Sequence, residues 1–257
     1  MTLRETTEPG EPAWASLFTS DVDTSRAFYG ALFGWMTSSL PDEAGDLFEL
    51  DGTPVVGLVA NTPDGGLPDS WTTFLLTDDA DASASAILAH GGQVLFSDRL
   101  GDLGTMMVAT DATGATIGAW QKGAHPGYTL RDAAGTPVWH ELHSLDFATS
   151  VSFYNAAFGW APNSIGDTDE FRMVILGDDA DSTAGIYDAS RDGEFDATQW
   201  VIYFAVDDTD ATVQRAVELG ATLEREAEDT PYGRLANLVD PGGVSFRVMQ
   251  VPSSPAE

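Results

Sequence analysis

Residues 139–143, which read WHELH, combine a glutamate and a histidine with the spacing of an acid–base pair. The segment predicts a strand, and because side chains two apart on a strand share a face, Glu141 and His143 are expected to lie together. Histidine titrates near neutral pH, so His143 could act as general acid or base while Glu141 orients its ring. His140 is three positions from His143 and would face the opposite side, which leaves at most two metal ligands. The cluster therefore favours proton transfer over metal binding.

The elements that must position these residues occur twice in the chain. Residues 14–35 read WASLFTSDVDTSRAFYGALFGW, and residues 139–160 read WHELHSLDFATSVSFYNAAFGW. Residues 200–250 match residues 71–121 without a gap. Each half is therefore predicted to hold two strand–helix–strand–strand–strand units, which gives an α+β fold built of four βαβββ modules.

Local signals mark where these elements begin and end. Asp21 is placed to cap the first helix, and Gly34 is placed to end it. Phe-Tyr and Phe-Gly-Trp in each copy follow helical spacing and are predicted to anchor helices on sheets. Asp111 and Asp240 open D-x-x-G segments, which predict hairpin turns in which the Asp side chain bonds the local backbone.

Composition narrows the class of protein. The chain has 257 residues and a formal net charge of −30, a sign that repels nucleic-acid phosphates and anionic lipid, so neither is expected as a partner. The absence of cysteine excludes disulfides, thiol nucleophiles and thiolate metal sites. No apolar run approaches membrane-spanning length and no secretory signal is present, so we expect a cytoplasmic protein. Residues 1–12 are polar and are predicted to form a loose arm.

The module order, with FYxxxFGW after the first strand and a D-x-x-G turn before the last, resembles the vicinal oxygen chelate superfamily (glyoxalase / bleomycin resistance protein / extradiol dioxygenase). The resemblance is closest to a two-domain glyoxalase-like subgroup often described as hydroxylases. It implies half-barrel domains at residues 13–121 and 138–251, a linker at 122–137, and one cavity in each domain. The superfamily contains isomerases, dioxygenases, thiol transferases and drug binders, so the activity stays open.

The resemblance also implies where a metal would be held. Metal-binding relatives place ligands on the first strand of each module and on the last strand of the second module. Those positions are predicted to fall at Trp14, Thr72 and Gly118 in the first half and at Trp139, Val201 and Arg247 in the second. None of these is a metal ligand, and the charge of Arg247 would repel a cation. We therefore expect no metal site and no cofactor.

The first cavity is expected to be aromatic. Strand alternation, combined with the resemblance, predicts Trp14, Phe18, Phe74 and Trp120 as residues that contact a ligand there. A flat apolar ligand could stack among these rings, since concave apolar sites with few polar groups are typical of binders. A packed half-barrel core has the same appearance in sequence. Both interpretations remain open.

The second cavity is expected to be polar at one side. Its predicted ligand contacts are Trp139, Tyr203, Ser245 and Met249, beside the candidate catalytic residues Glu141, His143 and Arg247. Arg247 could bind a carboxylate, a phenolate or a developing enolate. The alternative is that Arg247 simply pairs with Glu141 as a buried structural ion pair. Of the remaining histidines, His90 is expected to support a helix end, and His125 is expected to be exposed in the linker.

Two functions follow from these patterns. The first is a metal-independent pocket protein that binds or sequesters an oxygenated or aromatic small molecule. The second is a glyoxalase-related lyase, isomerase or hydroxylase-like enzyme that uses Glu141, His143 and Arg247. A divalent-metal glyoxalase or dioxygenase is a weaker third possibility, and a protein with both cavities filled is a fourth. The expected partner is a small organic ligand, and the chain is expected to be a monomer or a homodimer.

Overall fold

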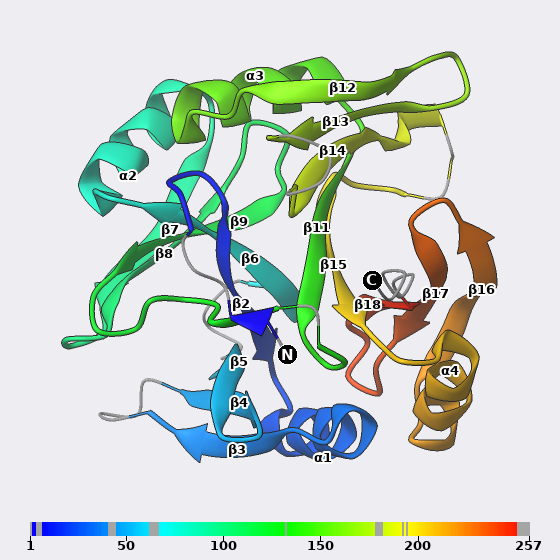
Figure 1. The fold of residues 1–257 in the computed structure, drawn as a ribbon. Coiled ribbons are helices and arrows are strands. Elements are labelled where there is room, and N and C mark those ends of the chain that lie inside the picture. Colours follow the sequence, from blue (N-terminus) through cyan, green and yellow to red (C-terminus); the bar gives the residue numbers. More distant parts are fainter. Residues whose placement is uncertain are drawn as a thin grey trace.

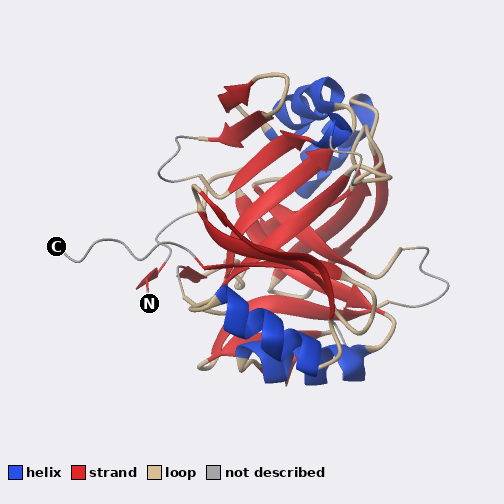
Figure 2. Ribbon diagram, turned by 90° about the vertical axis from the view of Figure 1, so that its right-hand side faces the viewer, coloured by secondary structure: helices blue, strands red, loops and turns tan. Residues whose placement is uncertain are grey.

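The computed structural model describes residues 2–3, 7–40, 45–61, 67–131, 133–177, 182–191, 193 and 195–250. Each half of the chain builds one eight-stranded sheet and two helices, as Figure 1 shows. Figure 2 shows the strands gathered through the middle of the molecule with the helices at two ends. The predicted α+β fold of four βαβββ modules is confirmed.

The first domain contains two modules in chain order. Its strands are β2 (Pro12–Thr19), β3 (Met36–Ser39), β4 (Asp46–Leu50), β5 (Thr53–Ala60), β6 (Ser70–Thr77), β7 (Gln93–Arg99), β8 (Gly104–Thr110) and β9 (Thr116–Lys122). Its helices are α1 (Val22–Phe33) and α2 (Ala80–Ala89). The sheet order is β3-β4-β5-β2-β6-β9-β8-β7, so the first strands of the two modules, β2 and β6, lie side by side at its centre.

The second domain repeats this arrangement. Its strands are β11 (Pro137–Ser144), β12 (Pro162–Asp167), β13 (Arg172–Leu176), β14 (Ala184–Asp188), β15 (Gln199–Ala205), β16 (Thr222–Thr230), β17 (Gly233–Val239) and β18 (Ser245–Gln250). Its helices are α3 (Phe147–Phe158) and α4 (Thr209–Glu218), with a short 3-10 turn at Ala189–Arg191. The order β12-β13-β14-β11-β15-β18-β17-β16 places β11 and β15 at the centre, with β18 beside β15.

The helix ends follow the predicted chemistry. The Asp21 carboxylate accepts a hydrogen bond from the Thr24 amide at 3.0 Å, which satisfies one of the free donors at the start of α1. Gly34 ends α1 in the left-handed conformation at φ 73°, which a residue without a Cβ adopts at low cost. In the second domain the cap is Asp146, and Gly159 ends α3 at φ 70°. His90 caps the C-terminal end of α2, as predicted.

The two domains hold each other through reciprocal contacts between their helices and turns. Helix α1 packs against α4, and α2 packs against α3 (Figure 1). The Tyr29 hydroxyl donates to the Asp240 carboxylate of the other domain at 3.0 Å, and Tyr154 donates to Asp111 at the same distance. Each Asp side chain also accepts from the backbone of its own turn, as predicted. The Phe-Tyr pairs therefore join the domains in addition to anchoring helices.

The segments outside the two domains are part of this joint. The Trp160 indole of the second domain donates to the Gly10 carbonyl at 2.8 Å, and the Trp35 indole of the first donates to the Gly135 carbonyl at 3.0 Å. Strand β1 (Thr2–Leu3) pairs with β10 (Leu130–Arg131). The tryptophan of the opposite domain therefore holds Gly10, which lies within the segment 1–12 that the sequence predicted as an arm.

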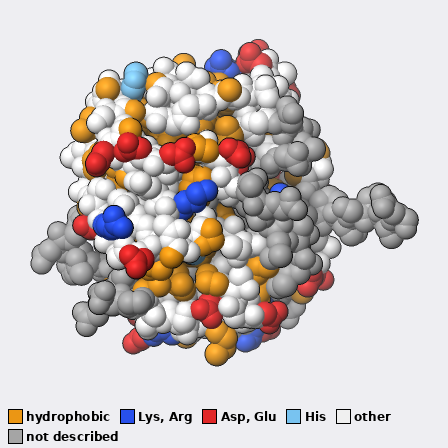
Figure 3. All heavy atoms as spheres, turned by 60° about the vertical axis from the view of Figure 1, so that its left-hand side comes forward, with side chains coloured by type: hydrophobic (Ala, Val, Ile, Leu, Met, Phe, Trp, Pro, Cys, Tyr) orange, Lys and Arg blue, Asp and Glu red, His pale blue; other side chains and the backbone are white. Residues whose placement is uncertain are grey.

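The surface carries the acidic residues that the net charge requires. On the face that Figure 3 shows, acidic and basic side chains are interspersed with neutral and apolar ones. Among the helices of the described residues, none combines the length and the apolar character needed to cross a membrane.

Candidate ligand-binding site

The second domain encloses a cavity of about 510 Å³ between its central strands and the loops at their ends. Its walls are mostly apolar and aromatic. They are formed by Val138, Trp139, Ile165, Phe171, Met173, Ile175, Ser182, Tyr187, Phe195, Thr230, Pro231, Tyr232, Leu235 and Met249, with Arg225 among them. The remaining lining residues are Glu141, His143, Tyr203 and Arg247, which form one polar cluster. We call these four residues the polar cluster.

Three neighbouring strands bring the polar cluster together. Glu141 and His143 are two apart on β11, so both side chains project into the cavity. Strand β15 runs antiparallel to β11, and β18 runs parallel to β15 with Arg247 directly opposite Tyr203. The Tyr203 hydroxyl donates to Glu141 Oε1 at 2.8 Å and accepts a short hydrogen bond from Arg247. Tyr203 therefore links the Glu141 carboxylate to the Arg247 guanidinium.

Charge is balanced within the cluster. Arg247 Nη1 lies 3.8 Å from Glu141 Oε1, and the guanidinium carbon lies 5.0 Å from the centre of the Tyr203 ring. Burial alone would raise the pKa of Glu141, but the contacts and charge of His143, the charge of Arg247 and the Trp139 indole N–H together lower it to about 2. Burial and the negative charge of Glu141 raise the pKa of Tyr203 well above its ordinary value. At neutral pH the cluster thus holds an ionised carboxylate and a protonated phenol.

His143 is held against the carboxylate and between aromatic rings. Its Nε2 atom lies 2.7 Å from Glu141 Oε1, and its side chain is almost completely buried. The imidazole packs against Phe195 at 4.5 Å and Tyr187 at 5.5 Å between ring centres. Glu141 therefore fixes the position of the imidazole. A ligand in the cavity would meet His143 beside an ionised carboxylate that can accept a hydrogen bond from the imidazole N–H.

The structure gathers most residues that the sequence predicted for this cavity. Trp139, Tyr203 and Met249 line it together with the candidate catalytic residues. Ser245 does not: it is exposed, and its hydroxyl lies 3.5 Å from Glu224. It shares a strand face with Arg247, but it is the first residue of β18, next to the exposed turn, and so lies beyond the cavity. Ser245, which the sequence predicted as a ligand contact, is therefore not among the residues that line this cavity.

Strand register shows which side chains lie beside Arg247. Trp139 lies opposite Tyr203, and Val201 lies opposite Glu141 in the β11–β15 pair. The two residues in contact with Arg247 are Tyr203 and Glu141, and Val201 is absent from the cavity lining. The neighbours of Arg247 thus lie two residues after Trp139 on β11 and two residues after Val201 on β15. His140 faces away from the cavity, as predicted, and its Nδ1 lies 2.9 Å from Thr73 Oγ1 of the first domain.

The polar cluster does not fit a divalent metal ion. Glu141 and His143 offer two donors, but the Arg247 guanidinium faces the same carboxylate oxygen at 3.8 Å, where it would repel a cation. The Tyr203 hydroxyl already donates to Glu141 and accepts from Arg247. Across the described ranges of the chain, no three His, Asp or Glu side chains form a group able to hold a metal.

The first domain has a smaller cavity of about 240 Å³. Trp14, Phe74 and Trp120 line it, as the sequence predicted, but Phe18 is buried in the hydrophobic core and is absent from the lining. His125 closes one side, with its ring perpendicular to Trp14 at 4.4 Å between centres. The prediction that His125 is exposed is therefore wrong, because the linker folds back over the cavity.

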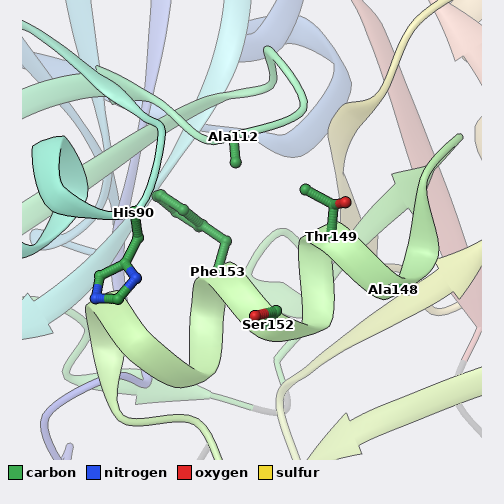
Figure 4. Close-up of a pocket in the computed structure, with 6 residues that line it drawn as sticks. All are labelled: His90, Ala112, Ala148, Thr149, Ser152 and Phe153. Atoms are coloured by element: carbon green, nitrogen blue, oxygen red, sulfur yellow. The ribbon is translucent and has the colours of Figure 1, made fainter.

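A third hollow lies on the surface between α2 and α3. It measures about 290 Å³ and is lined by His90, Ala112, Ala148, Thr149, Ser152 and Phe153. In the close-up of Figure 4, the Phe153 ring extends from α3 toward the end of α2 where His90 lies. The ring is buried and belongs to the core between the domains. This hollow contains none of the residues predicted for a ligand or for chemistry.

Sequence reasoning missed the outer wall of the larger cavity. Tyr187 lines it from the inner strand β14, and Phe171, Phe195 and Tyr232 line it from loops and turns. Phe171 and Tyr232 remain partly exposed there, at 37% and 52% of their surface. Their aromatic character was the only feature of the sequence that could have indicated them, because a loop has no periodicity from which to predict which side chains point into a cavity.

Comparison with known proteins places this geometry among related folds. The family model described as Glyoxalase/Bleomycin resistance protein/Dioxygenase superfamily matches residues 12–118 and 141–248. DauV of Streptomyces sp. strain C5, named an anthracycline biosynthesis protein, is 36% identical over 261 residues, which cover 95% of this chain and 94% of DauV.

Solved structures agree on the fold. A Mn(II)-bound glyoxalase from Novosphingobium aromaticivorans has a TM-score of 0.65 at 17% identity, and the match covers 95% of this chain and 83% of that one. The 2,3-dioxygenase LapB from Pseudomonas sp. KL28 has a TM-score of 0.63 at 13% identity, with 98% of this chain and 96% of that one covered. At such low identity these matches concern the arrangement of the modules alone.

Proposed function

The chain belongs to the Glyoxalase/Bleomycin resistance protein/Dioxygenase superfamily, and we propose that it binds an oxygenated aromatic small molecule in the cavity of its second domain. One observation carries the proposal: a cavity of about 510 Å³, whose walls are mostly aromatic and aliphatic, contains the polar cluster. Small-molecule sites typically measure roughly 300–1,000 Å³ and combine apolar walls with a few placed polar groups.

The walls and the cluster select different parts of such a ligand. Trp139, Phe195 and Tyr232 offer ring faces and edges to a flat apolar body. Arg247 offers N–H donors, and a phenolate, carboxylate or quinone oxygen would accept from them. The ionised Glu141 would accept from a hydroxyl group on the same ligand. A ring system with oxygen substituents at one end satisfies both regions.

The name of one relative suggests a class of ligand to test, the polycyclic quinones. The name of DauV assigns that protein to anthracycline biosynthesis, and DauV matches this chain over nearly its whole length. A hydroxylated anthraquinone has the flat body and the oxygen-bearing edge that the cavity favours. We take this class of compound as the first probe.

Titration with 1,4-dihydroxyanthraquinone tests the proposal by calorimetry and tryptophan fluorescence. Wild-type protein is expected to bind one molecule saturably and to lose indole emission as Trp139 is covered. The Glu141→Gln/Arg247→Met double variant removes both charges together and avoids leaving one of them buried alone. It is expected to bind at least about tenfold more weakly, since hydrogen bonds to charged groups contribute roughly 1.5–3 kcal/mol.

A matched variant locates the binding. Trp14→Phe changes an indole of the smaller cavity and is expected to leave both the affinity and most of the quenching unchanged. If the double variant binds as tightly as the wild type, the second-domain cavity is not the site. Elemental analysis of the same sample is expected to show no stoichiometric divalent metal, and a bound metal would contradict a metal-independent site.

A second function, proton transfer on the bound molecule, is favoured by the 2.7 Å contact between His143 and Glu141. His143 would take a proton from the ligand or return it, while Glu141 stabilises the imidazolium and Arg247 stabilises an enolate oxygen. His143→Ala is then expected to abolish turnover of an identified substrate while leaving its affinity within a few fold. Full turnover in this variant would show that His143 is not the group that transfers the proton.

A further inference from the structure

A row of polar residues crosses the sheet of the second domain from the polar cluster to the edge strand β16. Arg247 on β18 lies opposite Tyr203 on β15 and opposite Asn237 on β17. Asn237 in turn lies opposite Arg225 on β16 (Figure 1). Residues directly opposite each other share one face of a sheet, and Arg247 and Arg225 both line the larger cavity. We call Tyr203, Arg247, Asn237 and Arg225 the polar row.

The two arginines of the polar row lie at different depths. The Arg247 side chain has 10% of its surface exposed, whereas the Arg225 side chain has 45% exposed. Two strand spacings separate them, so their Cα atoms are roughly 10 Å apart. The β16–β17 ladder shifts register on both sides of Arg225, and such irregularities re-aim a side chain beside a site. One arginine thus lies within the polar cluster, and the other lies where the cavity opens to solvent.

The first domain lacks this row, although its sheet is built in the same way. The equivalent positions by the internal duplication pair in the same order across β6, β9, β8 and β7. They are occupied by Phe74, Gly118, Val108 and Phe96. The same strand pairing therefore forms without any polar side chain at these positions, so the sheet itself does not require the polar row. This favours a role for the row in binding a ligand.

The charge balance of the cavity lining is opposite to that of the chain. The whole sequence has 41 Asp and Glu against 11 Lys and Arg. Among the lining residues that the structure describes, Arg225 and Arg247 are basic and Glu141 alone is acidic. Glu141 offsets the charge of Arg247 within the lining, so the charge of Arg225 remains. A ligand with an anionic group toward the open end would be complementary to it.

We propose that Arg225 determines the specificity of this cavity for aromatic carboxylates. The inference rests on the proposed function and deepens it, because it adds a second anchor to the same ligand. The oxygen-bearing edge of the ring system lies at the polar cluster, and a carboxylate at the other end pairs with Arg225. The planar guanidinium can donate two parallel hydrogen bonds to such a group. A body of two or three fused rings with its substituents spans the roughly 10 Å between the two arginines.

Glu228 is the ion-pair partner with which a ligand carboxylate would compete. Arg225 Nη2 lies 2.9 Å from Glu228 Oε1, and both side chains are exposed. An ion pair between exposed, mobile side chains contributes little to stability. Glu228 is absent from the cavity lining, whereas a ligand carboxylate would meet the guanidinium beside apolar walls, where charge attraction is screened less. The exchange of one partner for the other is therefore favourable.

Fluorescence titration with two anthraquinones that differ in one group tests the proposal. Rhein and chrysophanol are both 1,8-dihydroxyanthraquinones, and at ring position 3 rhein carries a carboxylate where chrysophanol carries a methyl group. Wild-type protein is expected to bind rhein at least about tenfold more tightly than chrysophanol in the same buffer and cosolvent, because hydrogen bonds between charged groups contribute about that difference in affinity.

Three single substitutions test whether Arg225 causes this preference. Arg225→Gln is expected to bind both compounds with about equal affinity and to bind chrysophanol as tightly as the wild type does. Glu228→Gln removes the competing carboxylate and is expected to increase the preference for rhein. Arg215→Gln is the matched control, because Arg215 forms a similar exposed pair with Glu218 on α4, outside the cavity lining. It changes the net charge equally and is expected to retain the wild-type preference.

The outcomes distinguish a failure of this inference from a failure of the proposed function. Equal affinity of the wild type for rhein and chrysophanol, or an unchanged preference in Arg225→Gln, would overturn the role of Arg225. Saturable binding of chrysophanol would in that case still support an aromatic ligand in the cavity. If neither compound binds saturably to the wild type, the proposed function is wrong, and the role of Arg225 falls with it.

Discussion

Replacing Glu141 by glutamine should reveal how much of the folding free energy depends on the polar cluster. The Glu141 carboxylate accepts from Trp139 and Tyr203 and lies close to His143 and Arg247. Its pKa falls from an ordinary 4.5 to about 2. Because each pKa unit corresponds to about 1.36 kcal/mol, the ionised form stabilises the folded chain by on the order of 3 kcal/mol at neutral pH.

The pH dependence has a definite sign. The pKa of Glu141 is lower in the folded chain than in the unfolded one, so its contribution is fully present above pH 4.5 and is lost as the pH falls toward 2. Glu141→Gln is therefore expected to be less stable than the wild type by about 3 kcal/mol at pH 7, in line with the roughly 3–5 kcal/mol found when one partner of a buried ion pair is removed. The two proteins should approach equal stability near pH 2.

Urea unfolding followed by tryptophan fluorescence at several pH values measures both quantities. Glu224→Gln, at an exposed glutamate on β16, is the matched control and is expected to change stability by less than about 0.5 kcal/mol. A loss below about 1 kcal/mol at pH 7, with unchanged pH dependence, would show that the cluster is not the electrostatic unit described here.

Three further predictions concern other parts of the chain. Burial lowers the pKa of His125 from 6.5 to about 4, so on acidification the imidazole takes up a proton in the unfolded chain before it does so in the folded one. The free energy of unfolding should therefore fall by up to about 3 kcal/mol between pH 6.5 and 4. His125→Leu should remove this part of the pH dependence in the same urea series. Tyr29→Phe and Tyr154→Phe each remove one buried bond between the domains and should each cost about 1–3 kcal/mol, measured by calorimetry. Gly10→Ala should destabilise at least as much, because its Cβ would lie 2.6 Å from a backbone oxygen and its φ is +91°, and a melting temperature equal to the wild type would refute this.

The sequence predicted the fold well because the fold depends on repeated, periodic signals. The tandem WASLF and WHELH segments, the Asp caps and the glycine stops each specify local structure, and the duplication checks one half against the other. What periodicity cannot supply is where a strand enters or leaves a cavity. Ser245 and Phe18 have the correct alternation but lie beyond the hollow part of the sheet.

His125 shows the other limit of sequence reasoning. It lies in a segment with glycines and prolines, which predicts an exposed linker. In the structure the Tyr128 amide donates to the Ala13 carbonyl at 2.7 Å, and this tertiary contact draws the linker across the first-domain cavity. No local pattern encodes a contact between residues more than a hundred positions apart, so the histidine could be placed only by the three-dimensional structure.

The two cavities show how duplication separates scaffold from function. The residues that join the domains remain matched: Tyr29 and Tyr154 each bond an aspartate of the opposite domain, and Trp35 and Trp160 each bond a glycine carbonyl. The residues that line the cavities do not remain matched. Ser16 stands at the position of Glu141, and Phe18, Phe74 and Gly118 stand at the positions of His143, Tyr203 and Arg247. The interface between the domains is symmetric, so each contact made by one copy is matched by the equivalent contact of the other. The residues that form it are therefore constrained equally in both copies. A cavity wall carries no such reciprocal constraint, which allows one domain to hold a charged cluster and the other an aromatic pocket with a single histidine.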